Sequence, residues 1–100
     1  MAWYIKLNPV NEGDKTQFFS GWIKHRPDMP EAMRQILTRA GVKVGESTPM
    51  FTEDFASLLS FADEGMAQHT VNRIVKCIPD FDGHLFVKRL LEYVPSGDDE

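Results

Sequence analysis

The fold class is decided by the N-terminal segment, residues 2–23, which read AWYIKLNPVNEGDKTQFFSGWI. Every second residue from Trp3 to Leu7 is apolar, and such alternation is typical of a half-buried strand. Turn-forming residues follow, and residues 16–23 are then rich in aromatic and β-favouring side chains. We therefore predict an N-terminal β-hairpin, with Gly21 marking a bulge in its second strand.

A lone hairpin is marginally stable, so it needs helices packed on its apolar face. The first predicted helix begins near Pro30 and ends at Gly41. On a helical wheel, the apolar residues between Phe55 and Met66 point about 150° away from those between Val71 and Ile78. One straight helix cannot bury both stripes, so the chain should break near Gly65. These two helices are expected at residues 53–64 and 67–77. Between the first helix and these two we expect a short strand or extended connection at 42–44 and a loop at 45–49.

A last helix is expected after Pro79, capped by Asp80 or Asp82 and containing Leu85 to Val94. The predicted architecture is thus α+β, an N-terminal β-hairpin packed against about four short α-helices. We expect one small globular domain over residues 1–97, followed by an acidic disordered tail at 98–100.

The composition is typical of a soluble protein. No apolar run approaches the roughly 18 residues of a membrane span, and the chain does not begin with a signal segment. A single cysteine, Cys77, lies in an apolar run and permits no internal disulfide, so we interpret it as a small buried hydrophobe in a reducing compartment. A cytoplasmic location and no contact with membranes are expected.

No arrangement of residues indicates an enzyme, a metal site or a cofactor. His25, His69 and His84 lack the spacing of a zinc site, and no Gly-rich phosphate loop occurs between a strand and a helix. A catalytic pair of Cys77 with a histidine would lack any accompanying nucleophile turn. We therefore expect a protein that is not an enzyme and acts by binding.

Residues 65–76, GMAQHTVNRIVK, resemble the turn and second helix of helix-turn-helix DNA-binding units, with Gly65 as the turn glycine. The resemblance implies that Met66, Val71 and Ile74 pack inward. It directs Gln68, His69, Thr70, Asn72 and Arg73 outward. Of these, the Gln, Asn and Arg side chains are suited to base edges, and Lys76 is suited to a phosphate. The alternative interpretation is an ordinary helical corner with a polar outer face.

The net charge of −4 is unevenly distributed. Residues 1–44 carry a net charge of +3, whereas residues 45–65 carry −5 without one Lys or Arg. This acidic segment would attract a basic surface, such as that of a nucleic-acid-handling protein. Our leading hypothesis is a small regulator or inhibitor, of the kind that mobile elements encode, that binds a larger protein. The predicted partner contacts are Glu53, Asp54, Asp63, Glu64 and Trp22. The alternative is a DNA-binding regulator that uses Gln68, His69, Asn72, Arg73 and Lys76.

Overall fold

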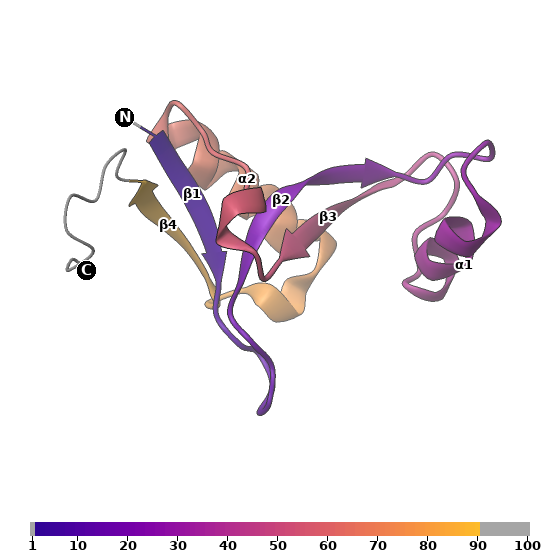
Figure 1. Ribbon diagram of the computed structural model, residues 1–100, viewed down its shortest axis with the longest axis horizontal. Helices are drawn as coiled ribbons and strands as arrows, with labels where there is room; N and C mark the ends of the chain where they lie inside the picture. The colour runs from indigo at the N-terminus through magenta and orange to yellow at the C-terminus, as the bar shows by residue number, and fades with distance from the viewer. Residues whose placement is uncertain (1, 91–100) are drawn as a thin grey trace.

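The computed structural model describes residues 2–90 and contains a four-stranded antiparallel sheet, in the order β3-β2-β1-β4, with two α-helices (Figure 1). The strands are β1 (Ala2–Leu7), β2 (Gln17–Lys24), β3 (Ser47–Thr52) and β4 (Leu85–Leu90). The helices are α1 (Glu31–Arg39) and α2 (Glu64–Cys77), with short 3₁₀ helices η1 (Phe55–Ser57) and η2 (Pro79–Phe81). The predicted α+β class is confirmed, whereas the prediction of about four α-helices is wrong.

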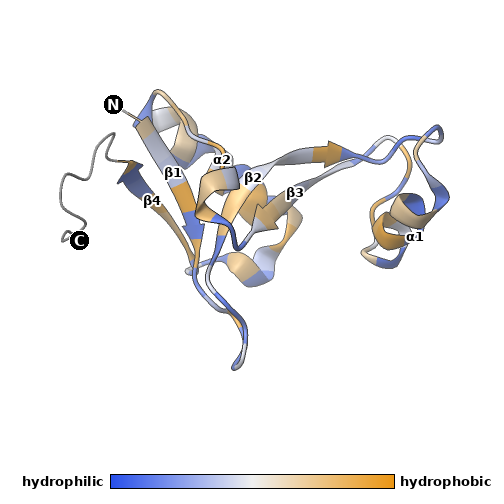
Figure 2. Cartoon of the chain, in the orientation of Figure 1, coloured by the Kyte–Doolittle hydropathy of each residue, from blue (hydrophilic) through white to orange (hydrophobic). Residues whose placement is uncertain are grey.

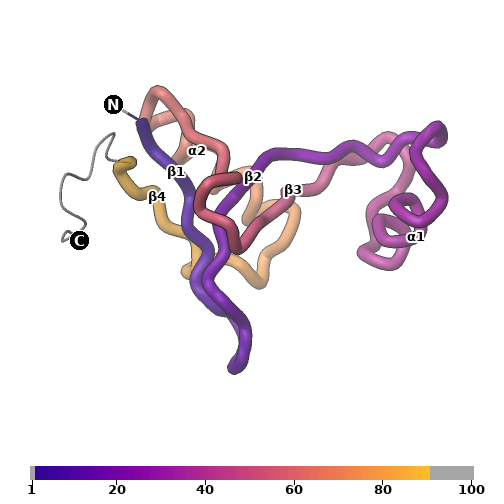
Figure 3. Tube along the Cα trace, viewed as in Figure 1, coloured from indigo at the N-terminus to yellow at the C-terminus, as the bar shows by residue number. Residues whose placement is uncertain are grey.

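β1 and β2 form the predicted hairpin, but they pair only next to the turn. The register places Lys6 opposite Phe18 and Leu7 opposite Gln17. Beyond these pairs the two strands splay apart (Figure 3). The predicted bulge is confirmed, because the register of β2 against β3 shifts at Gly21, whose φ of 139° is one that L side chains rarely adopt.

The predicted helix at 53–64 is not formed, because this segment fills the gap between the splayed strands. After η1 the chain is extended, and the N–H of Leu59 donates to the carbonyl of Phe19 on β2 at 2.9 Å. Phe61 exchanges hydrogen bonds of 2.7 and 2.8 Å with Trp3 on β1. Splaying leaves backbone groups of both strands without partners, and an extended segment satisfies them where a helix cannot.

Two strands replace other predicted structures. β3 covers most of the predicted loop and pairs with β2, while no strand forms at 42–44. β4 occupies the segment predicted as the last helix, and it pairs with β1 along its whole length. The outer edge of β1 needs a partner, and this long-range pairing overrides the local helical pattern. The rest of that predicted helix and the predicted tail at 98–100 lie outside the described residues.

α2 lies across one face of the sheet and forms the core with it (Figure 1). The buried residues of this core are Ile5, Phe19, Ala67, Val71 and Ile74. Side chains alternate along a strand, so Ile5 faces α2 whereas Tyr4 and Lys6 lie on the opposite face. The predicted helix at 67–77 is confirmed, with its start at Glu64.

β2 and β3 continue past the core as an arm that carries α1 at its end, and this extends the molecule to 46 Å (Figure 1). We call residues 25–46 the arm lobe. The predicted helix here is confirmed, and it ends where expected. Gly41 adopts a φ of 85°, and its N–H donates to the carbonyl of Thr38 at 3.0 Å.

Candidate interaction surfaces

The acidic residues predicted to share one helical face instead lie at the starts of two separate helices. Asp54 accepts a hydrogen bond from the N–H of Ala56 in η1 at 3.0 Å. Asp63 accepts one from the N–H of Gly65 in α2 at 3.1 Å, and Glu64 occupies the first turn. Asp63 and Glu64 therefore lie at the positive end of the helix dipole of α2. Their predicted place at the end of a preceding helix is wrong, and the alternative that they cap the next helix is confirmed.

These four exposed acids do not form one patch. Glu53 lines a groove of about 460 Å³ together with Ile78 and Asp80, beyond the C-terminal end of α2. Asp63 caps the opposite end of the same helix, and its 14 residues span roughly 20 Å. The negative charge of this segment is therefore distributed along the molecule.

The helix-turn-helix arrangement implied by residues 65–76 is absent from the described chain. α2 follows η1 and an extended segment instead of another helix. Met66 is 58% exposed where packing was expected, whereas Thr70 is buried and donates its hydroxyl to the carbonyl of Met66 at 2.9 Å. Val71 and Ile74 do pack inward. The remaining implied contacts form one exposed polar face of α2: Gln68, His69, Asn72, Arg73 and Lys76.

The arm lobe leaves apolar side chains uncovered. The apolar residues on one side of this helix were expected to form a buried stripe, but only Leu37 is buried among Ala32, Met33, Ile36, Leu37 and Ala40. Met33 is 39% exposed and Ile36 is 60% exposed, and Figure 2 shows hydrophobic and hydrophilic residues side by side on this helix. Within residues 2–90, α1 packs extensively against no other helix or strand. The stripe is exposed because the hairpin carries α1 away from the sheet.

The lobe is held together locally rather than by the body of the protein. His25 is buried, and its Nδ1 lies 2.8 Å from the carbonyl oxygen of Val42. Backbone hydrogen bonds of 2.8 Å connect His25 to Gly45 and Glu46. These contacts close the loop that follows α1 and fix the helix on the end of the arm.

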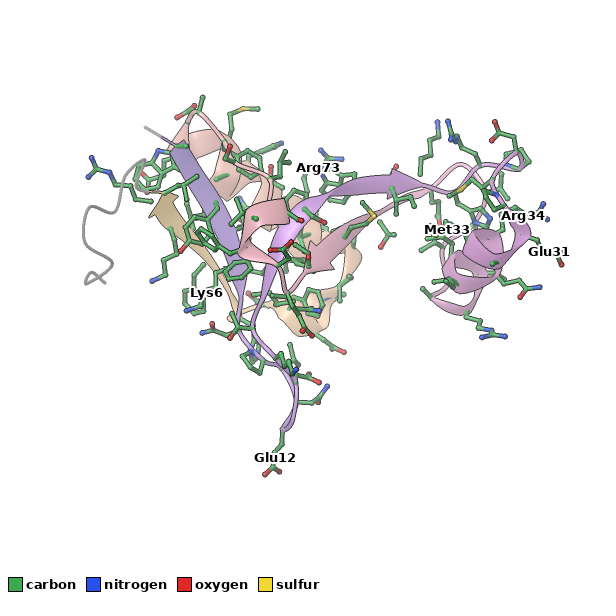
Figure 4. The ribbon with its side chains drawn as sticks, viewed as in Figure 1. Lys6, Glu12, Glu31, Met33, Arg34 and Arg73 are labelled. Carbon is green, nitrogen blue, oxygen red and sulfur yellow. The ribbon has the colours of Figure 1, made fainter. Side chains whose placement is uncertain are left out.

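A groove of about 500 Å³ lies at the elbow, where the arm meets α2. Trp22, Arg73 and Cys77 line it together with parts of the arm lobe. The guanidinium carbon of Arg73 lies 4.6 Å from the centre of the Trp22 ring, within the range of a cation–π interaction. Figure 4 shows Arg73 at the start of the arm, far from Glu31, Met33 and Arg34 on α1. The structure thus brings together two residues predicted for different partners.

Cys77 is exposed, so its predicted burial is wrong. Cys77 lines the elbow groove instead of packing against the sheet, which leaves the thiol open to solvent. Within residues 2–90, no three His, Cys, Asp or Glu side chains are arranged to hold a metal ion.

The face of the sheet opposite α2 was not predicted as a site. It carries Tyr4, Lys6, Phe18, Phe86 and Lys88, and we call it the open face. Phe86 and Lys88 lie in the segment predicted as the last helix, so their alignment with β1 does not follow from the local pattern. The aromatic residues Tyr4 and Phe18 of the N-terminal segment were the available signal.

A scan of protein-family models and searches of curated proteins and of solved structures find no match to this chain. No helix within residues 2–90 has the length and apolarity needed to cross a membrane.

Proposed function

We propose that this protein is a small cytoplasmic regulator or inhibitor that acts by binding a larger protein, and that the arm lobe is its main docking element. The observation that carries this proposal is the exposed apolar stripe of α1 at the end of a protruding arm. An isolated helix of nine residues is marginal in water. Apolar side chains left uncovered on such a helix are typical of an interface with another protein.

The elbow groove extends this docking surface toward the body of the protein. Trp22, one of the predicted partner contacts, is half-buried there beneath Arg73. Tryptophan and arginine are enriched among the residues that dominate binding energies at protein interfaces. A partner that contacts both Ile36 on the lobe and Trp22 at the elbow would use two parts of the arm at once.

The dispersed acids support a secondary role in this proposal. Glu53 and Glu64 are exposed. Both would favour approach to a basic partner through long-range attraction, which affects the association rate more than the affinity. A contact surface made by these acids alone is less well supported, because no single helix gathers them.

Affinity capture from a lysate of the source cells tests the proposal. Tagged wild type is compared with Ile36→Asp, and Thr38→Asp serves as the matched control because it introduces the same charge on the polar side of α1. A charge buried without a partner at an interface is strongly unfavourable. We expect Ile36→Asp to capture at least about tenfold less of a protein that wild type and Thr38→Asp both retain.

A variant with Glu53→Lys and Glu64→Lys separates the lobe from the acids, since both side chains are exposed. This variant should keep the same partner. Equal retention by Ile36→Asp and wild type would contradict docking by the lobe. Loss in the charge-reversed variant alone would assign the contact to the acidic residues instead.

A further inference from the structure

The open face alternates aromatic rings with lysines across three strands. On β1, Lys6 stands opposite Phe18 of β2 on one side and opposite Phe86 of β4 on the other. Tyr4 stands opposite Lys88 of β4. Residues directly opposite in an antiparallel pair lie on the same face with Cβ atoms about 5 Å apart. Each lysine of this face therefore has an aromatic ring on the neighbouring strand.

Two aromatic rings on this side of the sheet are open to solvent. Phe55 of η1 is 47% exposed and packs edge-on against Tyr4 and Phe18, with ring centres 5.3 and 5.2 Å apart. Phe86 is 40% exposed, and the Lys88 ammonium lies 6.0 Å from its ring centre. Phe86 and Phe18 are separated by two strand spacings, or about 10 Å. Phe86 is held by β4, and Phe55 is held by its packing on Tyr4 and Phe18, so neither ring needs to be ordered when a ligand binds.

The charge of the sheet is of one sign. None of the four strands contains an Asp or Glu. Neither Lys6 nor Lys88 forms an ion pair within residues 2–90. Asp54, which caps η1, directs its two carboxylate oxygens to the N–H of Ala56 and the hydroxyl of Ser57, and it forms no ion pair with either lysine within residues 2–90. The strands of the open face therefore place only positive charge beside the exposed rings, although the whole chain is acidic.

We propose that the open face binds single-stranded nucleic acid, with bases stacked on Phe86 and Phe55 and phosphates contacted by Lys88 and Lys6. Stacking on an aromatic ring needs an unpaired base, so a single strand fits this face and a duplex does not. A sheet that presents aromatic rings and positive charge is suited to a ligand with flat bases and a regularly spaced anionic backbone. This site is separate from the arm lobe and does not depend on the proposed protein partner.

Fluorescence anisotropy with labelled oligothymidylate and oligouridylate of about 12 nucleotides tests this proposal. The full chain is titrated from about 50 mM to about 200 mM salt, beside a labelled duplex of the same length. Wild type should bind the single strands more tightly than the duplex. Phe86→Ala should weaken single-strand binding by about fivefold to a hundredfold, the range for loss of one stacked base.

The salt dependence provides a readout that a purely structural effect would not change. The plot of log K against log salt has a negative slope, and Lys88→Gln should make it shallower by about 0.7, the value for one phosphate contact on a single strand. Lys76→Gln is the matched control, because it removes the same charge from the outer face of α2. If Phe86→Ala fails to fold, Phe55→Ala replaces it, since that ring lies on the surface of η1.

Several results would overturn the proposal. One is the absence of single-strand binding at the lowest salt. Another is an equal change of the salt slope in Lys88→Gln and Lys76→Gln. A third is tighter binding of the duplex that is lost in Arg73→Ala. The last result would place nucleic acid on α2. Ile36→Asp should leave oligonucleotide binding unchanged, so the open face and the arm lobe are tested separately.

Discussion

Two isoleucines of this chain occupy opposite environments, and replacing each with alanine measures how the molecule is built. Ile74 of α2 is fully buried in the core against the sheet. Ile36 of α1 is 60% exposed on the arm lobe. The same chemical deletion should therefore have very different effects on the free energy of unfolding.

Truncating Ile74 removes buried side-chain atoms and leaves a cavity between α2 and the sheet. Such changes cost about 2 to 5 kcal/mol of unfolding free energy. In a chain of this length, that loss lowers the melting temperature by at least about 8 °C. Truncating Ile36 removes surface that is already in contact with water, so its cost should stay below about 0.5 kcal/mol.

Circular dichroism during heating and during urea unfolding measures both variants beside wild type. Equal destabilisation by Ile74→Ala and Ile36→Ala would refute the account. In that case Ile36 would be packed within the molecule, and it would not be available to a partner protein.

Two further predictions concern α2. Asp63→Ala removes the side-chain cap seen at Gly65 and should lower the free energy of unfolding by about 0.5 to 2 kcal/mol in urea titrations. Glu64→Gln is its control, with an expected change of a few tenths of a kcal/mol, and equal effects of the two changes would contradict a capping role. Cys77, which is exposed at the elbow, should react fully with Ellman's reagent in the folded protein, and reaction only after denaturation would contradict its placement.

The local patterns of the sequence predicted those elements whose stability depends on neighbouring residues. The alternation from Trp3 to Leu7 identified β1, and the positions of Pro30 and Gly41 identified the bounds of α1. Gly21 was correctly predicted as a bulge because its backbone requirement is local. The same holds for the helix at 67–77, whose inward stripe includes Ile74.

The errors arose where distant segments decide the structure. Residues 53–64 have a helical stripe, but they become extended because Leu59 and Phe61 satisfy the backbone of two splayed strands. Residues 85–90 become β4 because β1 has an edge to be paired. The local periodicity of a segment carries no information about unpaired backbone groups on distant strands, so neither outcome follows from the sequence pattern.

The candidate sites follow from the same distinction. The acids at 53–64 looked like one surface only because a helix was expected there. The open face depends on the register of β4 against β1, which aligns Phe86 with Lys6. The exposed stripe of α1 depends on the length of the arm, since the same stripe would be core on a helix docked against the sheet.

Docking by the arm lobe is tested by amide hydrogen exchange of the free protein and of its complex with the captured partner. Mass spectrometry of peptides reports exchange along the chain. Docking by the lobe should slow exchange within residues 25–46, with smaller changes elsewhere. Slowed exchange confined to residues 53–64, with the lobe unchanged, would contradict it.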